Sequence, residues 1–192
     1  ELSRHLSGML GSTVHLKCEN LQRTGAYKLR GAYNMLSKLT PEQRERGVVA
    51  ASAGNHAQGV AFAASELGIR STIFMPLGAA LPKVQATRDY GARIELRGLD
   101  FQTALQAAVA HVAETGATFV PPYDHHDIIA GQGTLGLEIL DEQPDVETIL
   151  VPIGGGGLAA GVASAAKQRA AELGRELRVI GVQASAAAAY PP

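Results

Sequence analysis

The chain has 192 residues, of which 46% are hydrophobic and 18% are charged, and its formal net charge is −1. This size and composition are typical of a globular protein with one large or two small domains. Because the near-neutral charge offers no broad basic surface, we expect no nucleic acid and no membrane among the partners. No apolar run approaches the roughly 20 residues that a membrane-spanning helix needs. The single cysteine, Cys18, excludes an internal disulfide framework.

The hydrophobic periodicity predicts strands and helices that alternate along the chain. The first expected strand is 14–18; a helix from Lys28 and a helix from Thr40, with a capping-box-like start and Pro41 at the first helical position, follow it. The other expected strands are 48–51, 71–75, 93–96, 118–120, 149–153 and 179–182. The other expected helices are 55–67, 81–90, 101–115, 128–140 and 158–173.

Strands that alternate with helices of about ten or more residues indicate βαβ units and largely parallel sheets. The run from Val48 to Phe119 therefore predicts a compact α/β sub-domain. The segments before and after it must meet elsewhere, so we expect two lobes with a cleft between them.

The stretch 24–33 places Lys28 between a glycine-containing turn and an amphipathic run. At a helix N-terminus the partial positive charge of the helix dipole disfavours a second cation. That pushes the amine toward its neutral, nucleophilic form, which Schiff-base chemistry requires. On its own the stretch is more typical of an exposed lysine that opens a helix. The segments that follow in the chain favour the catalytic interpretation of Lys28 over that of an exposed lysine.

Four consecutive glycines, Gly154 to Gly157, separate an apolar strand from a helix. Glycines let backbone N–H groups close around an anion, and the helix N-terminus adds a favourable potential, so a phosphate fits this loop. A plain tight turn is the alternative. The dinucleotide fingerprint also matches at Gly154, Gly156 and Ala159, but it requires an acidic residue after the next strand, where Gln183 stands.

A second strand-to-helix junction carries Ser52-Ala53-Gly54-Asn55-His56. A hydroxyl, backbone N–H groups and a helix N-terminus converge there, which suits a carboxylate. Asn55 adds an amide that can bind a ring oxygen. We interpret His56 as a structural or hydrogen-bonding histidine rather than a catalytic base.

The adjacent His125 and His126, near Asp124, lack the spacing of metal ligands because neighbouring side chains point different ways. We therefore expect a polar loop or a helix start there, and no metal site.

An amine nucleophile, a phosphate loop and a carboxylate loop on one α/β scaffold suggest a pyridoxal-phosphate enzyme that acts on an amino acid. The chain resembles the threonine dehydratases (threonine ammonia-lyases) and the serine racemases, of the tryptophan-synthase-β type (fold type II). The resemblance covers essentially the whole chain and is carried by six segments in order: 16–22, 27–34, 52–59, 121–124, 129–134 and 151–158.

The resemblance implies a role for each matching residue. Lys28 would form the Schiff base with pyridoxal 5'-phosphate and act as the catalytic residue, with Tyr27 beside the cofactor ring and Asn55 on its hydroxyl. The phosphate would be held by the backbone of five residues: Gly154, Gly155, Gly156, Gly157 and Leu158. The substrate carboxylate would be held by four: Ser52, Gly54, Asn55 and His56. Ala26 and Tyr27 depart from the serine and phenylalanine that many relatives carry.

The fold so implied has two lobes, each a three-layer αβα arrangement around a parallel sheet. Residues 1–33 and 125–192 would form the large, cofactor-binding lobe, and residues 34–124 the small lobe. The family's fold continues beyond Pro192, so we expect a fragment whose large lobe is incomplete. The residue that meets the pyridine nitrogen, and the cation site of some relatives, would lie in that continuation.

The implied activity is removal of the β-hydroxyl of L-threonine, or of L-serine, giving 2-oxobutanoate or pyruvate plus ammonia. Racemisation needs a second acid/base group where the racemases place a serine, and Ala53 has no proton to give. Serine racemase and a non-catalytic fragment that binds pyridoxal phosphate remain as alternatives. A cytoplasmic homodimer or homotetramer is expected. A role in isoleucine biosynthesis or in catabolism, a regulatory domain and the preference between threonine and serine stay open.

Overall fold

The computed structural model describes residues 1–190. The last two residues of the expected large-lobe range 125–192 lie outside the described residues. The α-helices are α1 (Arg4–Leu10), α2 (Lys28–Ser37), α3 (Pro41–Arg46), α4 (Asn55–Glu66), α5 (Leu81–Asp89), α6 (Phe101–Thr115), α7 (His126–Glu142) and α8 (Gly157–Glu172). The strands are β1 (Val48–Ala51), β2 (Ser71–Met75), β3 (Arg93–Leu96), β4 (Thr118–Phe119), β5 (Thr148–Pro152) and β6 (Arg178–Val182). Two short 3₁₀ helices are η1 (Glu19–Leu21) and η2 (Ser185–Ala187).

The first four strands form one parallel sheet in the order β3-β2-β1-β4. All four residues of β1 are buried, and they alternate between two cores. Val48 and Ala50 belong to the core that includes residues of α4, whereas Val49 and Ala51 pack with Ala108 of α6. Because successive side chains of a strand point to opposite faces, helices cover both faces of this sheet and make three layers.

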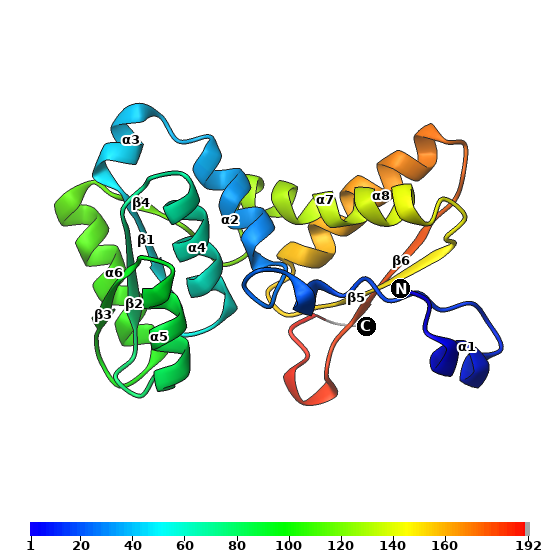
Figure 1. Cartoon of the computed structure of the whole chain (residues 1–192), viewed down its shortest axis with the longest axis horizontal. Coiled ribbons are helices and arrows are strands. Elements are labelled where there is room, and N and C mark those ends of the chain that lie inside the picture. The colour runs from blue at the N-terminus through cyan, green and yellow to red at the C-terminus, as the bar shows by residue number, and fades with distance from the viewer. Residues whose placement is uncertain (191–192) are drawn as a thin grey trace.

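The second sheet is the parallel pair β5–β6, and the long helices α7 and α8 pack beside it (Figure 1). The two helices approach closely where glycines face the partner backbone. A Cβ at Gly161 of α8 would overlap the carbonyl oxygen of Ile129, and one at Gly136 of α7 would lie 2.9 Å from the carbonyl oxygen of Val162. These glycines therefore set the distance between α7 and α8.

Helix α2 lies between the two groups of elements and packs against both α4 and α7 (Figure 1). A Cβ at Gly59 of α4 would lie 3.1 Å from the carbonyl carbon of Lys28. One at Gly131 of α7 would lie 2.6 Å from the carbonyl oxygen of Arg30. The first turn of α2 is thus enclosed by backbone on two sides.

Six of the seven expected strands are confirmed, with bounds that differ by a residue or so, as is the capping box at Thr40. The strand expected at 14–18 is wrong. Only an isolated antiparallel bridge joins His15 to Leu2, and the chain then turns into η1. An alternating pattern becomes a strand only where a neighbouring strand completes its hydrogen bonds, and residues 1–3 offer too little backbone for that. Helix α1 was not predicted; its only side-chain cap is Ser3, and none of its residues is buried.

Within the described residues, no helix has the length and hydrophobicity needed to cross a lipid bilayer.

Candidate active site

Lys28 is the first residue of α2, and Tyr27 stands at the N-cap. The Lys28 side chain is half-buried, and its Nζ donates a hydrogen bond to the carbonyl oxygen of Pro122 at 2.6 Å. Nζ also lies 5.3 Å from the centre of the Tyr27 ring. Burial lowers the pKa of the Lys28 amine, because removing a cation from water disfavours its charged form. The sequence predicted this direction from the helix dipole; the cause found in the structure is burial.

The segment 120–123, directly after β4, connects the three regions that the sequence singled out. The carbonyl oxygen of Val120 lies 2.9 Å from Nε2 of His56, and the carbonyl of Pro122 accepts the bond from Lys28. A Cβ at Gly157 would lie 2.7 Å from the carbonyl oxygen of Tyr123. No role was predicted for this segment. The signal it carried was two prolines at the carboxyl end of a parallel strand, where ligand sites of α/β folds gather.

The loop 52–56 follows β1 at the carboxyl edge of the first sheet. Ser52 Oγ accepts a hydrogen bond from the Gly54 N–H at 3.2 Å, and α4 begins at Asn55 without a side-chain cap. The first N–H groups of an uncapped helix have no partner inside that helix, so they are available to an anion. The Asn55 side chain is exposed at this helix start.

His56 is buried, with 5% of its surface exposed. The pKa of its imidazole is lowered to about 4, chiefly by burial; the bond to Val120 opposes this shift, and the charge of the nearby Lys28 adds to it. Since a carbonyl oxygen can only accept, Nε2 carries the proton and donates it to Val120. The ring is therefore neutral and structural at neutral pH, as the sequence suggested, and its backbone N–H is the group that could contact a carboxylate.

The glycine loop begins after β5 and ends in the first turn of α8. Gly156 is the N-cap with φ of 87°, in the left-handed region that favours glycine, and no side chain caps the helix. A Cβ at Gly155 would overlap the Tyr123 ring, whereas a Cβ at Gly154 would meet no atom within 4 Å. Leu158 is buried in the core between α8 and β5. Free N–H groups and the dipole of a 16-residue helix suit a phosphate here.

His125 caps α7, with Nδ1 accepting the N–H of Asp127, and the helix begins at His126. The expectation of a helix start at these histidines is therefore confirmed.

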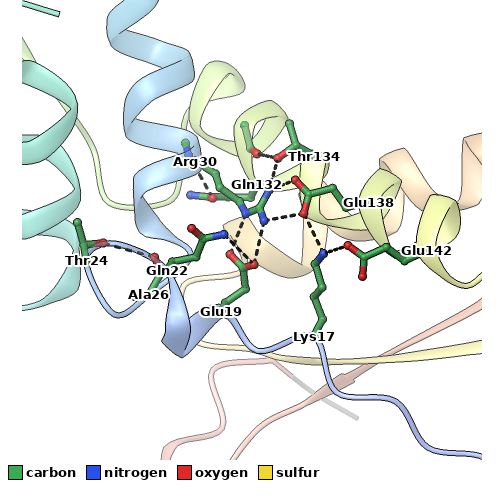
Figure 2. A network of polar contacts seen from close by, with 12 residues as sticks. Lys17, Glu19, Gln22, Thr24, Ala26, Arg30, Gln132, Thr134, Glu138 and Glu142 are labelled. Atoms are coloured by element: carbon green, nitrogen blue, oxygen red, sulfur yellow. Dashed lines mark hydrogen bonds and ion pairs between the residues drawn. The ribbon is translucent and has the colours of Figure 1, made fainter. Parts of the chain in front are cut away.

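A network of ion pairs lies beside the Lys28 turn and was not predicted (Figure 2). The Arg30 guanidinium, on α2, binds Glu19 at 2.8 Å and Glu138 of α7 at 2.6 Å. Lys17 pairs with Glu138 at 3.0 Å and also with Glu142. Hydrogen bonds from Arg30 hold the pKa of the Glu138 carboxyl down at about 2. The segment that leads to Lys28 is thus tied to α2 and α7 by charge.

The residues present fit pyridoxal phosphate. Lys28 supplies a half-buried amine whose pKa is lowered, and the uncapped start of α8 supplies an anion site beside Tyr123. The uncapped start of α4, connected to Lys28 through Val120 and Pro122, supplies a second anion site suited to a carboxylate.

Known proteins resemble the chain over nearly its whole length. It is 54% identical over 96% of its residues to the L-threonine ammonia-lyase of Geobacter sulfurreducens, and 53% identical over 93% to that of Thermotoga maritima. It is 48% identical over 94% to the catabolic L-threonine dehydratase TdcB of Escherichia coli. It covers 45%, 43% and 54% of these relatives, so the chain spans about half of their length.

Solved structures show the same likeness. Threonine deaminase isoform 2 from Solanum lycopersicum matches with a TM-score of 0.91 and 42% identity, over 95% of this chain and 49% of that one. Maize serine racemase matches with a TM-score of 0.89 and 38% identity, over 94% of this chain and 54% of that one. The family described as pyridoxal-phosphate dependent enzyme matches residues 1–191. With a lysine, a glycine loop and an αβα scaffold in agreement with that match, the chain belongs to the family of pyridoxal-phosphate dependent enzymes.

Proposed function

We propose that the protein containing this chain is a lyase that removes the β-hydroxyl and the amino group of L-threonine, releasing 2-oxobutanoate and ammonia. L-Serine would give pyruvate in the same way. The observation that carries the proposal is the Lys28 amine, which burial makes easier to deprotonate and which Pro122 holds in one direction. The identity of about 50% to threonine ammonia-lyases supports the choice of substrate.

Pyridoxal phosphate, when bound, withdraws electrons from the substrate's Cα and so makes its proton acidic. Lys28 would hold the cofactor covalently through Nζ, and the backbone of residues 154–158 would bind its phosphate. Tyr27 would lie beside the ring and Asn55 would bind the ring hydroxyl. These roles rest on the resemblance and on the uncapped start of α8.

The substrate carboxylate would be bound at the start of α4. Ser52 contributes a hydroxyl, and Gly54, Asn55 and His56 contribute backbone N–H groups at an uncapped helix. A carboxylate at this point also gains from the helix dipole, by roughly 0.3–1 kcal/mol. The buried, neutral imidazole of His56 keeps the loop attached to Val120.

When the amino group of the substrate has released Lys28 from the cofactor, the free Nζ would take the Cα proton of the bound substrate. A base needs an unprotonated lone pair, and the lowered pKa of Lys28 increases the fraction of neutral amine at neutral pH. The carbonyl of Pro122, which accepts a bond from Nζ, orients the amine.

Lys28→Ala tests this role in the full-length protein supplied with pyridoxal phosphate. We expect formation of 2-oxobutanoate from L-threonine to fall by at least about 10²-fold, the usual contribution of a general base. Lys83→Ala, a change at an exposed lysine of α5, is the matched control and should retain the activity. Equal activity of Lys28→Ala and the control would refute the proposal.

Elimination is favoured over racemisation by Ala53, which has no proton to deliver to the second face of the substrate. We expect the full-length enzyme to convert L-serine to pyruvate without accumulating D-serine. The test is chiral chromatography of the serine that remains during turnover. Accumulation of D-serine at a rate close to that of pyruvate would favour the racemase alternative. The structural similarity to maize serine racemase is the reason to test that alternative.

A non-catalytic protein that binds pyridoxal phosphate is the other alternative, and cofactor capture without any 2-oxo acid from either substrate would support it. We further propose two lobes, residues 34–124 and residues 1–33 with 125–192; separate sheets for β1–β4 and β5–β6 support this division. We also propose that the protein is a cytoplasmic homodimer or homotetramer. It would act either in the pathway to isoleucine or in threonine catabolism; the catabolic name of TdcB among the relatives is the reason to include the second pathway.

A further inference from the structure

In the first turn of α2, the fourth helical amide bonds to a side chain of another helix and not to the N-cap carbonyl. In α4, α6 and α8, the fourth helical amide bonds to the carbonyl of the N-cap residue, as Gln58 does to Gly54 at 3.4 Å. In α2 the carbonyl of the N-cap, Tyr27, instead accepts the N–H of Arg30 at 3.0 Å, which is a 3₁₀ bond. The fourth amide of α2, that of Gly31, donates to Oε1 of Gln132 at 3.2 Å.

Gln132 lies in α7 and reaches across to α2 (Figure 2). Its side chain is only 1% exposed. A Cβ at Gly31 would overlap the Gln132 amide, and a Cβ at Gly131 would lie 2.6 Å from the carbonyl oxygen of Arg30. Two glycines therefore make room for this single contact, on the turn that begins with Lys28.

An apolar side chain of similar volume could fill this position, but it would offer no acceptor to the Gly31 N–H. The specific consequence of Gln132 is geometric. Gln132 accepts the Gly31 N–H, while the Tyr27 carbonyl accepts the N–H of Arg30, so both amides at the end of this turn have a partner. The direction in which a side chain leaves a helix follows from the backbone of its turn.

Resting on the proposed role of Lys28, we propose that Gln132 is a positioning residue that binds the fourth amide of α2, fixes the first turn of that helix and thereby directs Lys28 toward Pro122. A reacting amine displaced by about 1 Å can lose on the order of 10²-fold in rate, so this contact matters to catalysis although Gln132 does not touch the substrate.

Hydrogen exchange of the full-length protein tests the contact itself, without any variant. In an ordinary first turn the third amide has no partner inside the helix, whereas here Arg30 and Gly31 both have one. We therefore expect the amides of both Arg30 and Gly31 to exchange at least tenfold more slowly than those of Lys28 and Leu29, which start the helix. Exchange of either Arg30 or Gly31 as fast as those two would overturn the proposal, whatever the activity of the enzyme.

Gln132→Met keeps a similar volume and removes the acceptor. The measured quantity is the pH midpoint at which Lys28 captures pyridoxal phosphate, read after borohydride reduction and peptide mapping. A loosened turn lets water reach Nζ, which raises its pKa, so the midpoint should move to higher pH and kcat should fall about tenfold or more. Tyr27 and His56 are titratable side chains close to Lys28; burial raises the pKa of Tyr27 and lowers that of His56, so both stay neutral between pH 6 and 9.

Thr87→Val is the control, because Thr87 is fully buried in α5 and donates to the Lys83 carbonyl at 2.8 Å. It removes a buried hydrogen bond far along the chain from Lys28. We expect it to lower stability and leave the midpoint unchanged. An unchanged midpoint in Gln132→Met, or an equal shift in Thr87→Val, would overturn the proposal. If the unaltered enzyme captures no cofactor at Lys28, the proposed function fails first, and the Gly31 exchange still reports whether the contact exists. If Gln132→Met does not fold, the hydrogen exchange of the unaltered protein alone decides whether the proposal stands.

Discussion

His56 shows how a residue that looks catalytic in the sequence is committed to structure. Its imidazole is buried and donates to Val120, and burial is the main reason its pKa is lowered to about 4. A histidine that must stay neutral in the folded state makes the protein sensitive to acid. The unfolded chain binds a proton near pH 6.5, whereas the folded chain does not until about pH 4.

The pH dependence of stability should therefore carry the signature of His56. Above pH 6.5 the residue is neutral in both states and has no effect; as the pH falls from 6.5 to 4, it should reduce the free energy of unfolding by about 3 kcal/mol. His56→Gln, which keeps a donor for Val120 and cannot titrate, should flatten this part of the curve. Urea unfolding at a series of pH values measures it.

The control is His5→Gln, at an exposed position of α1. It should leave the slope between pH 6.5 and 4 as it is in the unaltered protein. The account of His56 is wrong if both variants keep the same slope.

The packing of α7 on α8 is set by glycine at the level of the element. Gly161 has no room for a side chain because the carbonyl oxygen of Ile129 occupies the space. Gly133 lies opposite, where a Cβ would be 3.0 Å from the carbonyl oxygen of Gly161. A methyl group at this interface would push the helices apart along with the loop 154–157 that begins α8.

Gly161→Ala should lower the free energy of unfolding by about 3 kcal/mol, the upper range for overpacking a core. Gly8→Ala is a matched helical control, because Gly8 lies in α1 with no atom within 4 Å of the added Cβ. It should be neutral or stabilise by up to about 1 kcal/mol, since alanine favours the helix. Denaturant unfolding measures both, and equal effects of the two changes would contradict the account.

Element positions could be predicted well from the sequence, for physical reasons that are local. β1 is a short apolar run bounded by Gly47 and Ser52, and α3 carries its start signal at Thr40. The strand expected at 14–18 failed because pairing depends on a partner that periodicity cannot reveal. Lys28 and the loops before α4 and α8 could be found because glycine-rich turns and helix starts are visible in a sequence.

The rest of the site depends on contacts between distant residues, which no local pattern records. Pro122 meets Lys28 across 94 positions, and Gln132 meets Gly31 across 101. Roles for these residues follow only from the fold.

At the scale of the whole molecule, the charge network joins three parts of the chain that are far apart in sequence. Arg30 binds both Glu19 and Glu138. The side chain of Arg30 is 12% exposed and that of Glu19 is 14% exposed. Partly buried, bidentate arginine–carboxylate pairs of this kind are stronger than ion pairs on a surface. The network therefore fastens the segment before Lys28 to α7.

Arg30→Lys should lower the free energy of unfolding by about 2 kcal/mol, because an ammonium cannot reproduce the guanidinium's hydrogen bonds to two carboxylates. Arg93→Lys is the matched control; Arg93 pairs with Glu95, but its side chain is 73% exposed. Its effect should stay within about 0.5 kcal/mol. Similar losses from both changes, measured by denaturant unfolding, would mean that the network contributes no more than a surface pair.

The most direct measurement for the whole account is the site of cofactor attachment. The full-length protein is incubated with pyridoxal phosphate, reduced with borohydride, digested and mapped, with Lys28→Ala treated in parallel. If Lys28 binds the cofactor, one principal label will appear on the peptide that carries Lys28, and it will be lost in the variant. A label spread over exposed lysines such as Lys83, unchanged in Lys28→Ala, would contradict it.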